Sequence, residues 1–364
     1  MAHALRLAER GLYTTAPNPR VGCVIAHGDE VVGSGFHQRA GEPHAEVYAL
    51  REAGERARGA TAYVTLEPCA HQGRTPPCAD ALVAAGVKRV VIAVEDPFPQ
   101  VAGRGAARLR AAGIAVDAGL MGEAARELNI GFFSRIERGR PFVRVKLAMS
   151  LDGRTALASG ESKWITGEAA RTDVQHWRAR SSAILSGSGT VLADNPRLTV
   201  RVASTSRAHG TEADHEGEFM PPLRVILDRQ LRTPAGSHVL DGSVPTLLLH
   251  GAAASCADGR FSRVERIALA THGDGLDLHA ALGLLAGRGC NEVQVEAGPV
   301  LCGALFAAGL ADELLLYIAP LLLGDRARPL MQLPTLGDMA RRWQLQAVDQ
   351  RMLGQDIRLR LRPN

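Results

Sequence analysis

The segments HAE (44–46) and LEPCAHQGRTPPC (66–78) decide how the first part of this 364-residue chain is interpreted. Each motif follows a predicted strand and opens a predicted helix. One imidazole and two thiolates give Zn²⁺ three ligands and leave its fourth tetrahedral position open, which is typical of a catalytic zinc. The pattern therefore predicts a zinc ion held by His44, Cys69 and Cys78.

Glu46 lies two residues after His44, within reach of a water on that metal. Water bound to zinc ionises near neutral pH and becomes a nucleophile. A carboxylate beside it can take the proton and pass it to a substrate ring nitrogen. Zinc-dependent nucleobase deaminases share this arrangement. The alternative is a purely structural zinc with His71 as fourth ligand, which leaves Glu46 without a role.

Helix and strand patterns alternate along residues 1–139 and predict a sheet flanked by helices. Gly28-Asp29 separates two apolar runs and indicates a hairpin. The predicted helices cover 2–11, 44–54 and 78–86, and the predicted strands cover 21–26, 30–36, 60–66 and 89–96.

A second α/β domain is predicted for residues 140–364, after the Gly- and Pro-containing boundary near Arg140. No G-x-G-x-x-G follows its first strand, so a doubly wound dinucleotide-binding fold is not supported. The polar, aperiodic segment 203–222 is interpreted as an exposed insertion. The predicted strands of the second domain are 182–187, 223–228, 246–251, 292–298 and 313–320, and its predicted helices are 168–180 and 277–288.

Composition argues against several classes of protein. The 42 Lys and Arg and 38 Asp and Glu are mixed along the chain, and only 4% of residues are aromatic, so a nucleic-acid surface is not indicated. No apolar run reaches membrane-spanning length, and the N-terminal segment does not resemble a signal peptide. Six irregularly spaced cysteines do not form a disulfide scaffold. We therefore expect a cytoplasmic protein with neither a membrane nor a nucleic-acid partner.

The motifs CAHQGRTPPC (69–78) and TAPNPRVGCVIA (15–26) closely resemble the deaminase domain of the bifunctional riboflavin-biosynthesis deaminase/reductases. The resemblance implies a cytidine-deaminase-like three-layer αβα fold. It also implies hydrolytic loss of an amino group from a diaminopyrimidinone that carries a ribosylamino 5′-phosphate. His71 and Arg74, in the long spacer between the cysteines, and Asn18 would contact this substrate. Asn18 is also consistent with a simple turn-former between two prolines.

Four segments of the second domain resemble the reductase domain of the same family: KLAMSLDGRTA (146–156), GESKWITG (160–167), SGTVLADNPRLTVR (188–201) and VEAGPVLCGALF (295–306). The resemblance implies a dihydrofolate-reductase-like α/β fold in which NADPH reduces the ribosyl side chain to a ribityl chain. The implied cofactor contacts are Ala148, Trp164, Thr190, Asp194, Gly298, Pro299, Val300, Leu301, Cys302, Gly303 and Ala304. The implied substrate contacts are Ser162, Arg178, Leu198, Arg201 and Glu296.

Several roles stay open at this point. Arg178 and Arg201 suit a phosphate clamp, or belong to solvated faces. Asp152 either polarises the opening sugar or caps the LDG turn, and Lys146 is a similar case. Arg229 stands where the family often has a small hydroxyl residue, and we expect it to meet the NADPH 2′-phosphate.

Together these observations predict a bifunctional enzyme, a zinc hydrolase that deaminates a phosphorylated pyrimidine and an NADPH-dependent oxidoreductase that then reduces it. We expect a homo-oligomer, either a dimer or a tetramer; the apolar run ELLLYIAP (313–320) suggests a buried interface or a core strand. The alternative is a nucleic-acid or nucleoside deaminase with a non-catalytic C-terminal binding domain. That class predicts a short cysteine spacing and a basic, aromatic groove, neither of which the sequence contains.

Overall fold

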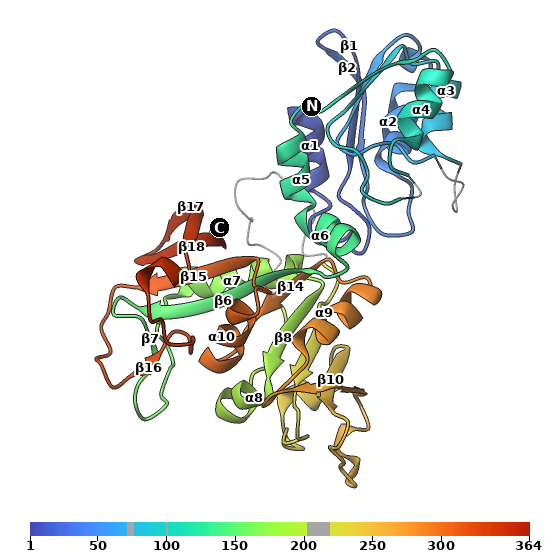
Figure 1. Cartoon of the computed structure of the whole chain (residues 1–364). Coiled ribbons are helices and arrows are strands. Elements are labelled where there is room, and N and C mark those ends of the chain that lie inside the picture. The colour runs from blue at the N-terminus through green and yellow to red at the C-terminus, as the bar shows by residue number, and fades with distance from the viewer. Residues whose placement is uncertain (71–75, 100, 202–218) are drawn as a thin grey trace. The chain divides into compact units, whose positions relative to one another are not determined.

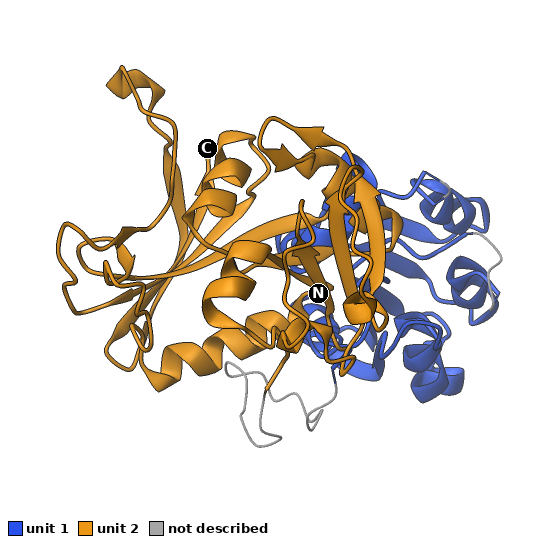
Figure 2. Cartoon of the chain, turned by 90° about the horizontal axis from the view of Figure 1, so that it is seen from below, with its two compact units in different colours: residues 1–140, 204–220 blue, residues 141–203, 221–364 orange. Residues whose placement is uncertain are grey.

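The computed structural model describes residues 1–70, 76–99, 101–201 and 219–364. The chain forms two compact units, shown in blue and orange in Figure 2. Unit 1 comprises residues 1–140 and 204–220, and unit 2 comprises residues 141–203 and 221–364. Most of the predicted insertion at 203–222 lies outside the described residues. In the described part of the chain, no helix combines the length and apolar character needed to cross a membrane.

Unit 1 is a three-layer αβα structure around a five-stranded sheet of order β2-β1-β3-β4-β5 (Figure 1). Strand β1 is antiparallel to β2 and β3, whereas β3, β4 and β5 are parallel. Helices α1 and α5 lie on one side of the sheet, and α2, α3 and α4 lie on the other. The bounds are α1 Ala2–Glu9, β1 Gly22–His27, β2 Glu30–Phe36, α2 Ala45–Ala53, β3 Thr61–Val64, α3 Cys78–Ala84, β4 Arg89–Ile92, α4 Arg104–Ala111, β5 Ala115–Ala118, α5 Gly122–Leu128 and α6 Ile130–Arg138.

Glycines in β2 let helix α2 approach the sheet closely. A Cβ atom on Gly33 would lie 2.2 Å from the Ala49 carbonyl oxygen, and one on Gly35 would lie 2.6 Å from that of Ala45. Any larger residue would push the helix away. Because α2 begins with His44 as its N-cap, this contact also fixes where the HAE motif lies.

Unit 2 contains a nine-stranded sheet of order β11-β10-β9-β8-β14-β6-β15-β18-β17. All neighbouring strands are parallel except the β15–β18 and β18–β17 pairs. The bounds are β6 Phe142–Ser150, β7 Arg154–Ala156, α7 Glu168–Arg180, β8 Ala183–Gly187, α8 Ser188–Asp194, β9 Leu223–Leu227, β10 Thr246–Gly251, β11 Glu265–Leu269, β12 Thr271–His272, β13 Gly275–Leu276, α9 Leu278–Gly287, β14 Glu292–Val295, α10 Pro299–Ala307, β15 Glu313–Ala319, β16 Arg328–Pro329, β17 Leu345–Leu353 and β18 Asp356–Pro363.

The alternation of β6 gives this sheet two different faces. Val143, Val145 and Leu147 belong to the main apolar core, together with residues of α9 and α10. On the other face, the fully buried Arg144 contacts Glu292 at 3.0 Å and Glu313 at 2.6 Å. A buried charge is tolerated only when it is paired in this way, so this face depends on ion pairs between distant strands.

The expected α/β class holds for both units, and each predicted strand and helix named above corresponds to an observed element. Helices α5 and α6 and the β17–β18 hairpin were not predicted. The apolar run 313–320 forms β15, which lies between β6 and β18 inside the sheet. Its apolar character therefore reflects the core, and the interface interpretation of this segment is wrong.

Candidate active sites

The three predicted zinc ligands lie together in unit 1. His44 is the N-cap of α2, Cys69 follows β3, and Cys78 is the first residue of α3. The His44 Nδ1 atom is 3.3 Å from the Cys78 Sγ and 3.6 Å from the Cys69 Sγ. All three donor atoms lie within 4.8 Å of one another. This separation allows a single ion to bind all three.

The chemistry of the donors fits Zn²⁺, which prefers sulfur and nitrogen ligands in tetrahedral geometry. The Cys78 backbone N–H donates to the Cys69 Sγ at 3.3 Å, which favours a thiolate. Hydrogen bonds from Cys78 and His44 lower the pKa of the Cys69 thiol, and its proximity raises the pKa of Cys78. A metal that replaces the shared proton would bind both sulfur atoms as thiolates.

Glu46 lies in the first turn of α2, two residues from His44, and only 3% of its surface is exposed. Burial raises the pKa of its carboxyl group to about 7. A carboxylate in this environment can both accept and return a proton near neutral pH. The geometry thus places a buried carboxyl group with a raised pKa beside the donor cluster.

Asn18 is connected to this cluster through a histidine that was not predicted. The Asn18 Nδ2 atom is 3.1 Å from the His37 Nε2 atom, and the His37 Nδ1 atom is 3.1 Å from the Pro43 carbonyl oxygen. The His37 ring also meets that of His44 edge-on at 5.6 Å. His37 directly follows β2 and is 3% exposed, but the polar residues Gln38 and Arg39 come next, so no local pattern in the sequence marked it as part of the site. The predicted contacts His71 and Arg74 lie outside the described residues.

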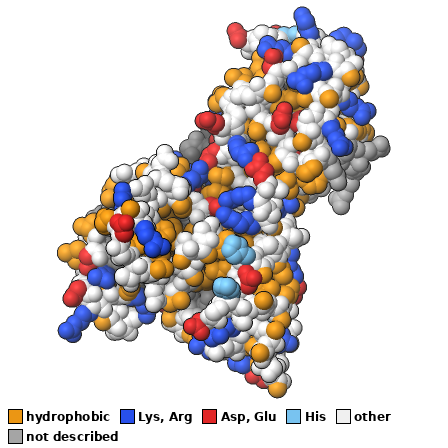
Figure 3. Space-filling model, in the orientation of Figure 1, with side chains coloured by type: hydrophobic (Ala, Val, Ile, Leu, Met, Phe, Trp, Pro, Cys, Tyr) orange, Lys and Arg blue, Asp and Glu red, His pale blue; other side chains and the backbone are white. Residues whose placement is uncertain are grey.

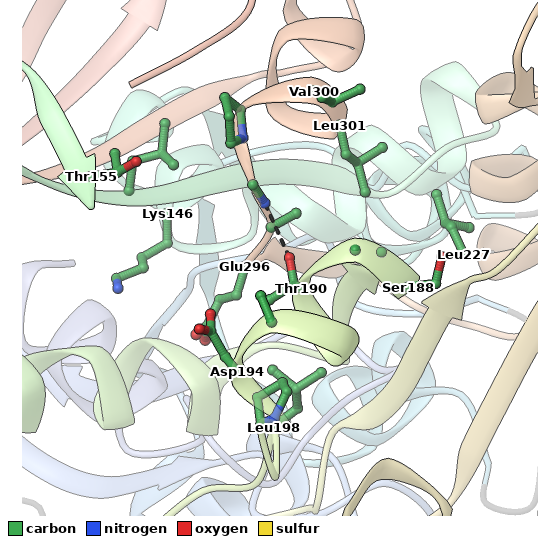
Figure 4. A pocket seen from close by; sticks show the side chains of 18 of the residues that line it. Lys146, Thr155, Ser188, Thr190, Asp194, Leu198, Leu227, Glu296, Val300 and Leu301 are labelled. Carbon is green, nitrogen blue, oxygen red and sulfur yellow. Dashed lines mark hydrogen bonds between the residues drawn. The ribbon is translucent and has the colours of Figure 1, made fainter. Parts of the chain in front are cut away.

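Unit 2 holds a cavity of about 1470 Å³ at the carboxyl ends of β6, β8 and β14 (Figure 4). Ligands of parallel α/β sheets bind at this edge. Pockets for one small ligand are typically about 300–1,000 Å³, so this cavity has room for two. Its lining includes the predicted residues Ala148, Ser162, Trp164, Arg178, Thr190, Asp194, Leu198, Arg201, Glu296, Gly298, Pro299, Val300, Leu301 and Ala304.

Two predicted cofactor contacts do not line this cavity. Cys302 is fully buried, and its thiol donates to the Ala297 carbonyl oxygen at 3.3 Å. A Cβ atom on Gly303 would lie 2.0 Å from the Gln332 carbonyl oxygen. Because consecutive helix residues point in different directions, both residues pack α10 against the protein while its first turn faces the cavity.

Glu296 and Arg178 form a buried ion pair on one wall of the cavity. The guanidinium donates to both carboxylate oxygens, at 2.6 and 2.7 Å, and also to the Thr199 carbonyl oxygen at 2.8 Å. Burial alone would raise the pKa of Glu296, but Arg178 and Lys146 lower it to about 2. Arg178 thus lines the cavity, as predicted, and its bonds to these partners hold Glu296 in place.

The N-terminus of α10 offers backbone donors to the cavity. Gly298, its N-cap, donates its N–H to the Thr190 hydroxyl at 3.2 Å, the dashed line in Figure 4. Pro299 has no N–H, so the Val300 and Leu301 N–H groups are the first-turn donors. A helix start of this kind suits a phosphate group.

Arg229 also lines the cavity and is the second residue after β9. Its carbonyl oxygen accepts from the Gly251 N–H at 3.0 Å, so its backbone is fixed between β9 and β10. Within the described part of the chain, its guanidinium forms no ion pair. Asp152, by contrast, is absent from the lining and accepts from the Leu323 and Gly324 N–H groups, so it ties the LDG turn to the distant segment that follows β15.

Basic and acidic side chains are interspersed over the visible face of each unit in Figure 3. A nucleic-acid-binding protein usually gathers its Lys and Arg side chains on one surface. Neither this face nor the nearly balanced composition of 42 basic and 38 acidic residues indicates such a surface.

Two family models match the chain. The cytidine and deoxycytidylate deaminase zinc-binding region matches residues 1–94, and the RibD C-terminal domain matches residues 141–359. Together they assign a deaminase to the part that contains the donor cluster and a RibD-type domain to the part that contains the cavity.

Whole-chain comparisons agree with the two family models. The riboflavin biosynthesis protein RibD of Escherichia coli is 51% identical and covers 99% of this chain and 98% of its own length. That of Haemophilus influenzae is 50% identical over 100% of this chain and 96% of its own. Among solved structures, Acinetobacter baumannii RibD has a TM-score of 0.90 at 46% identity, covering 100% of this chain and 97% of that one. A Thermotoga maritima diaminohydroxyphosphoribosylaminopyrimidine deaminase/5-amino-6-(5-phosphoribosylamino)uracil reductase reaches 0.85 at 32% identity, with the same coverage.

Proposed function

The chain belongs to the RibD family of bifunctional riboflavin-biosynthesis enzymes, and from this premise we propose how its own side chains carry out the two reactions. It is a zinc-dependent deaminase and an NADPH-dependent reductase. The first reaction removes an amino group from 2,5-diamino-6-ribosylamino-4(3H)-pyrimidinone 5′-phosphate. The second reduces the ribosyl chain to give 5-amino-6-(5-phosphoribitylamino)uracil.

For the deaminase we propose that His44, Cys69 and Cys78 hold the metal and that Glu46 moves the proton. When bound, Zn²⁺ supplies the Lewis acidity that activates water. Glu46 takes a proton from that water and delivers it to the pyrimidine, where it assists departure of ammonia. Asn18, held by His37, orients the ring. The observation that carries this proposal is the cluster of three donor atoms within 4.8 Å.

For the reductase we propose that the two halves of the cavity hold different ligands. The first turn of α10, with Thr190, Asp194, Ala148 and Trp164, binds NADPH, which supplies hydride to the sugar C1′ carbon. The other wall, with Ser162, Leu198, Arg201 and Glu296, binds the substrate. Arg201 is exposed at the edge of the cavity and is the better candidate for the phosphate, because Arg178 is committed to Glu296.

The nucleic-acid or nucleoside deaminase with a non-catalytic C-terminal domain is not favoured. A RibD C-terminal model matches residues 141–359, and that region contains a cavity large enough for a cofactor and a substrate together. A binding module for a polymer would need a continuous basic surface instead.

We further propose a homodimer formed through β17, in a cytoplasmic protein. Strand β17 is the last strand of the nine-stranded sheet, and Leu345, Val348 and Met352 on it are 37%, 41% and 61% exposed. The edge strand of a sheet leaves backbone N–H and C=O groups unpaired and is a template for another strand, and exposed apolar side chains on it favour covering it. Multi-angle light scattering measures the resulting mass.

The cytoplasmic assignment is supported by six cysteines that all occur as free thiols.

Metal analysis combined with a coupled assay tests the two activities. The purified chain is expected to contain one zinc per chain, to release ammonia from the diamino substrate, and to oxidise NADPH only once the deaminated product is present. A chain without zinc that still released ammonia would contradict the proposed metal site. A chain that deaminated but never oxidised NADPH would contradict the proposed cavity roles.

A further inference from the structure

Glu67 lies in the LEPC motif, between β3 and the ligand Cys69, and has no part in the mechanism above. It is 3% exposed. Its Oε2 atom accepts from the Gly103 N–H at 2.9 Å and from the Asp96 N–H at 3.4 Å, and its Oε1 atom accepts from the Ala106 N–H at 3.0 Å. One buried carboxylate thus satisfies three backbone donors from a distant part of the chain.

Two of these donors belong to the start of α4. Gly103 is the N-cap of this helix and has no side chain to cap it, and Ala106 lies in its first turn. The N–H groups there have no partner within the helix, and the helix dipole favours a negative charge beside them. Glu67 therefore caps α4 from another segment of the chain.

The residue after Glu67 is pressed against the same helix. A Cβ atom on Gly105 would lie 1.9 Å from the Pro68 carbonyl oxygen, so only glycine fits this contact. On its other side, the Cys69 carbonyl oxygen accepts from the Ala79 N–H at 3.2 Å. The short loop that carries Cys69 is therefore fixed by α4 at one end and by α3 at the other.

We propose that Glu67 is a positioning residue for the metal site. By anchoring Pro68 to the first turn of α4, its carboxylate holds the Cys69 Sγ atom at the distance from His44 and Cys78 that one ion requires. Because the loop is ordered before the metal arrives, binding does not pay the entropy of ordering it. The inference rests on the zinc site proposed above.

Glu67→Gln tests this role. The amide keeps one acceptor oxygen but turns an N–H₂ group toward backbone N–H donors, so the anchor is lost. Groups that hydrogen-bond to a metal ligand typically change metal affinity by about 10–100-fold when they are mutated, and we expect the lower value, about tenfold, for Glu67 because it acts on Cys69 through Pro68. We expect that loss of zinc affinity in the full chain, measured after metal removal by competition with a chromophoric chelator. The visible bands of the Co²⁺-substituted variant should also shift, because they report ligand geometry.

The matched control is Asp277→Asn. Asp277 caps α9 in unit 2 by accepting from the Ala280 N–H at 3.0 Å, and it lies in the unit without the metal site. This variant loses the same kind of cap and should bind zinc as the wild type does. Circular dichroism reports whether each variant remains folded, and NADPH oxidation is not used for this purpose because Asp277 lines the cavity of unit 2.

Gly105→Ala is the second test, needed if Glu67→Gln loses its circular dichroism signal. It keeps the carboxylate but pushes Pro68 away, and zinc affinity should fall as well. Unchanged zinc affinity in a folded Glu67→Gln or Gly105→Ala variant overturns the positioning role alone. A wild-type chain that bound no zinc would instead overturn the proposed metal site.

Discussion

The two units present their chemistry in opposite ways. In unit 1 the donor cluster and Glu46 come from two short motifs, and the donor atoms lie within 4.8 Å. In unit 2 the cavity is lined by segments that extend from Lys146 to Leu330, and a cofactor supplies the reacting hydride. The protein atoms that react are therefore few in unit 1, whereas in unit 2 the protein binds and orients. Single substitutions should accordingly abolish the first activity but weaken the second by degrees.

Glu46→Ala should give the largest effect and separates the two activities. Loss of a general acid–base group costs about 10²–10⁴-fold in rate, so ammonia release should fall by that amount. NADPH oxidation on the deaminated product should stay at the wild-type rate, because Glu46 belongs to unit 1. Both rates are measured on the same preparation. Equal loss of both activities, or loss of neither, would contradict the contrast between the units.

Arg178→Met should have the next largest effect, on the stability of unit 2. The substitution leaves the Glu296 carboxylate buried without its main partner, which typically costs about 3–5 kcal/mol. All three tryptophans (Trp164, Trp177 and Trp343) lie in unit 2, so tryptophan fluorescence during urea unfolding follows this unit alone.

The control for this prediction is Arg288→Met. It breaks the Arg288–Glu265 pair, in which the side chains are 33% and 50% exposed. Exposed pairs contribute about 0–1 kcal/mol, so the urea midpoint should hardly move. Similar shifts in both variants would show that the Arg178–Glu296 pair is no more important than a surface contact.

The sequence was sufficient to predict site residues that lie in one short motif, but not to predict contacts between residues that lie far apart in the chain. His44, Glu46 and Cys69 were identified because each lies in a compact motif at the end of a predicted element. The ion pair between Arg178 and Glu296 was not predicted, because the two residues lie on different elements and no local pattern links them.

The same limit explains the elements and residues that were missed. The β17–β18 hairpin is held by contacts with elements far away in the chain, namely β15 through pairing with β18 and α7 through the Arg358–Asp173 ion pair, and β18 carries many charged residues. Glu67 was noticed without a role, because the helix that it caps lies far along the chain. Capping by a distant side chain leaves no signature at the helix start itself, which here is Gly103.

Acid should destabilise unit 2 partly through Glu296. Its pKa is lowered to about 2 from an ordinary value of 4.5, so its contribution is complete above pH 4.5 and is lost as pH falls toward 2. The shift corresponds to about 3 kcal/mol. Urea midpoints by tryptophan fluorescence at pH 7, pH 5 and pH 3 measure the loss. In Glu296→Gln this part of the pH dependence should disappear, and an unchanged profile would assign the acid sensitivity to other carboxyl groups.

Arg229→Ala should give the smallest effect, and it tests how much a single side chain of unit 2 contributes to the affinity for NADPH. If the Arg229 guanidinium meets the 2′-phosphate, its loss removes one charged hydrogen bond of about 1.5 kcal/mol, or about tenfold in affinity. The ratio of kcat/KM for NADPH to that for NADH should fall by this factor, with kcat for NADPH nearly unchanged. Arg341→Ala removes the same charge from an exposed position outside the cavity and should leave the ratio as it is. Equal preference in the wild type and Arg229→Ala would assign 2′-phosphate recognition to another residue.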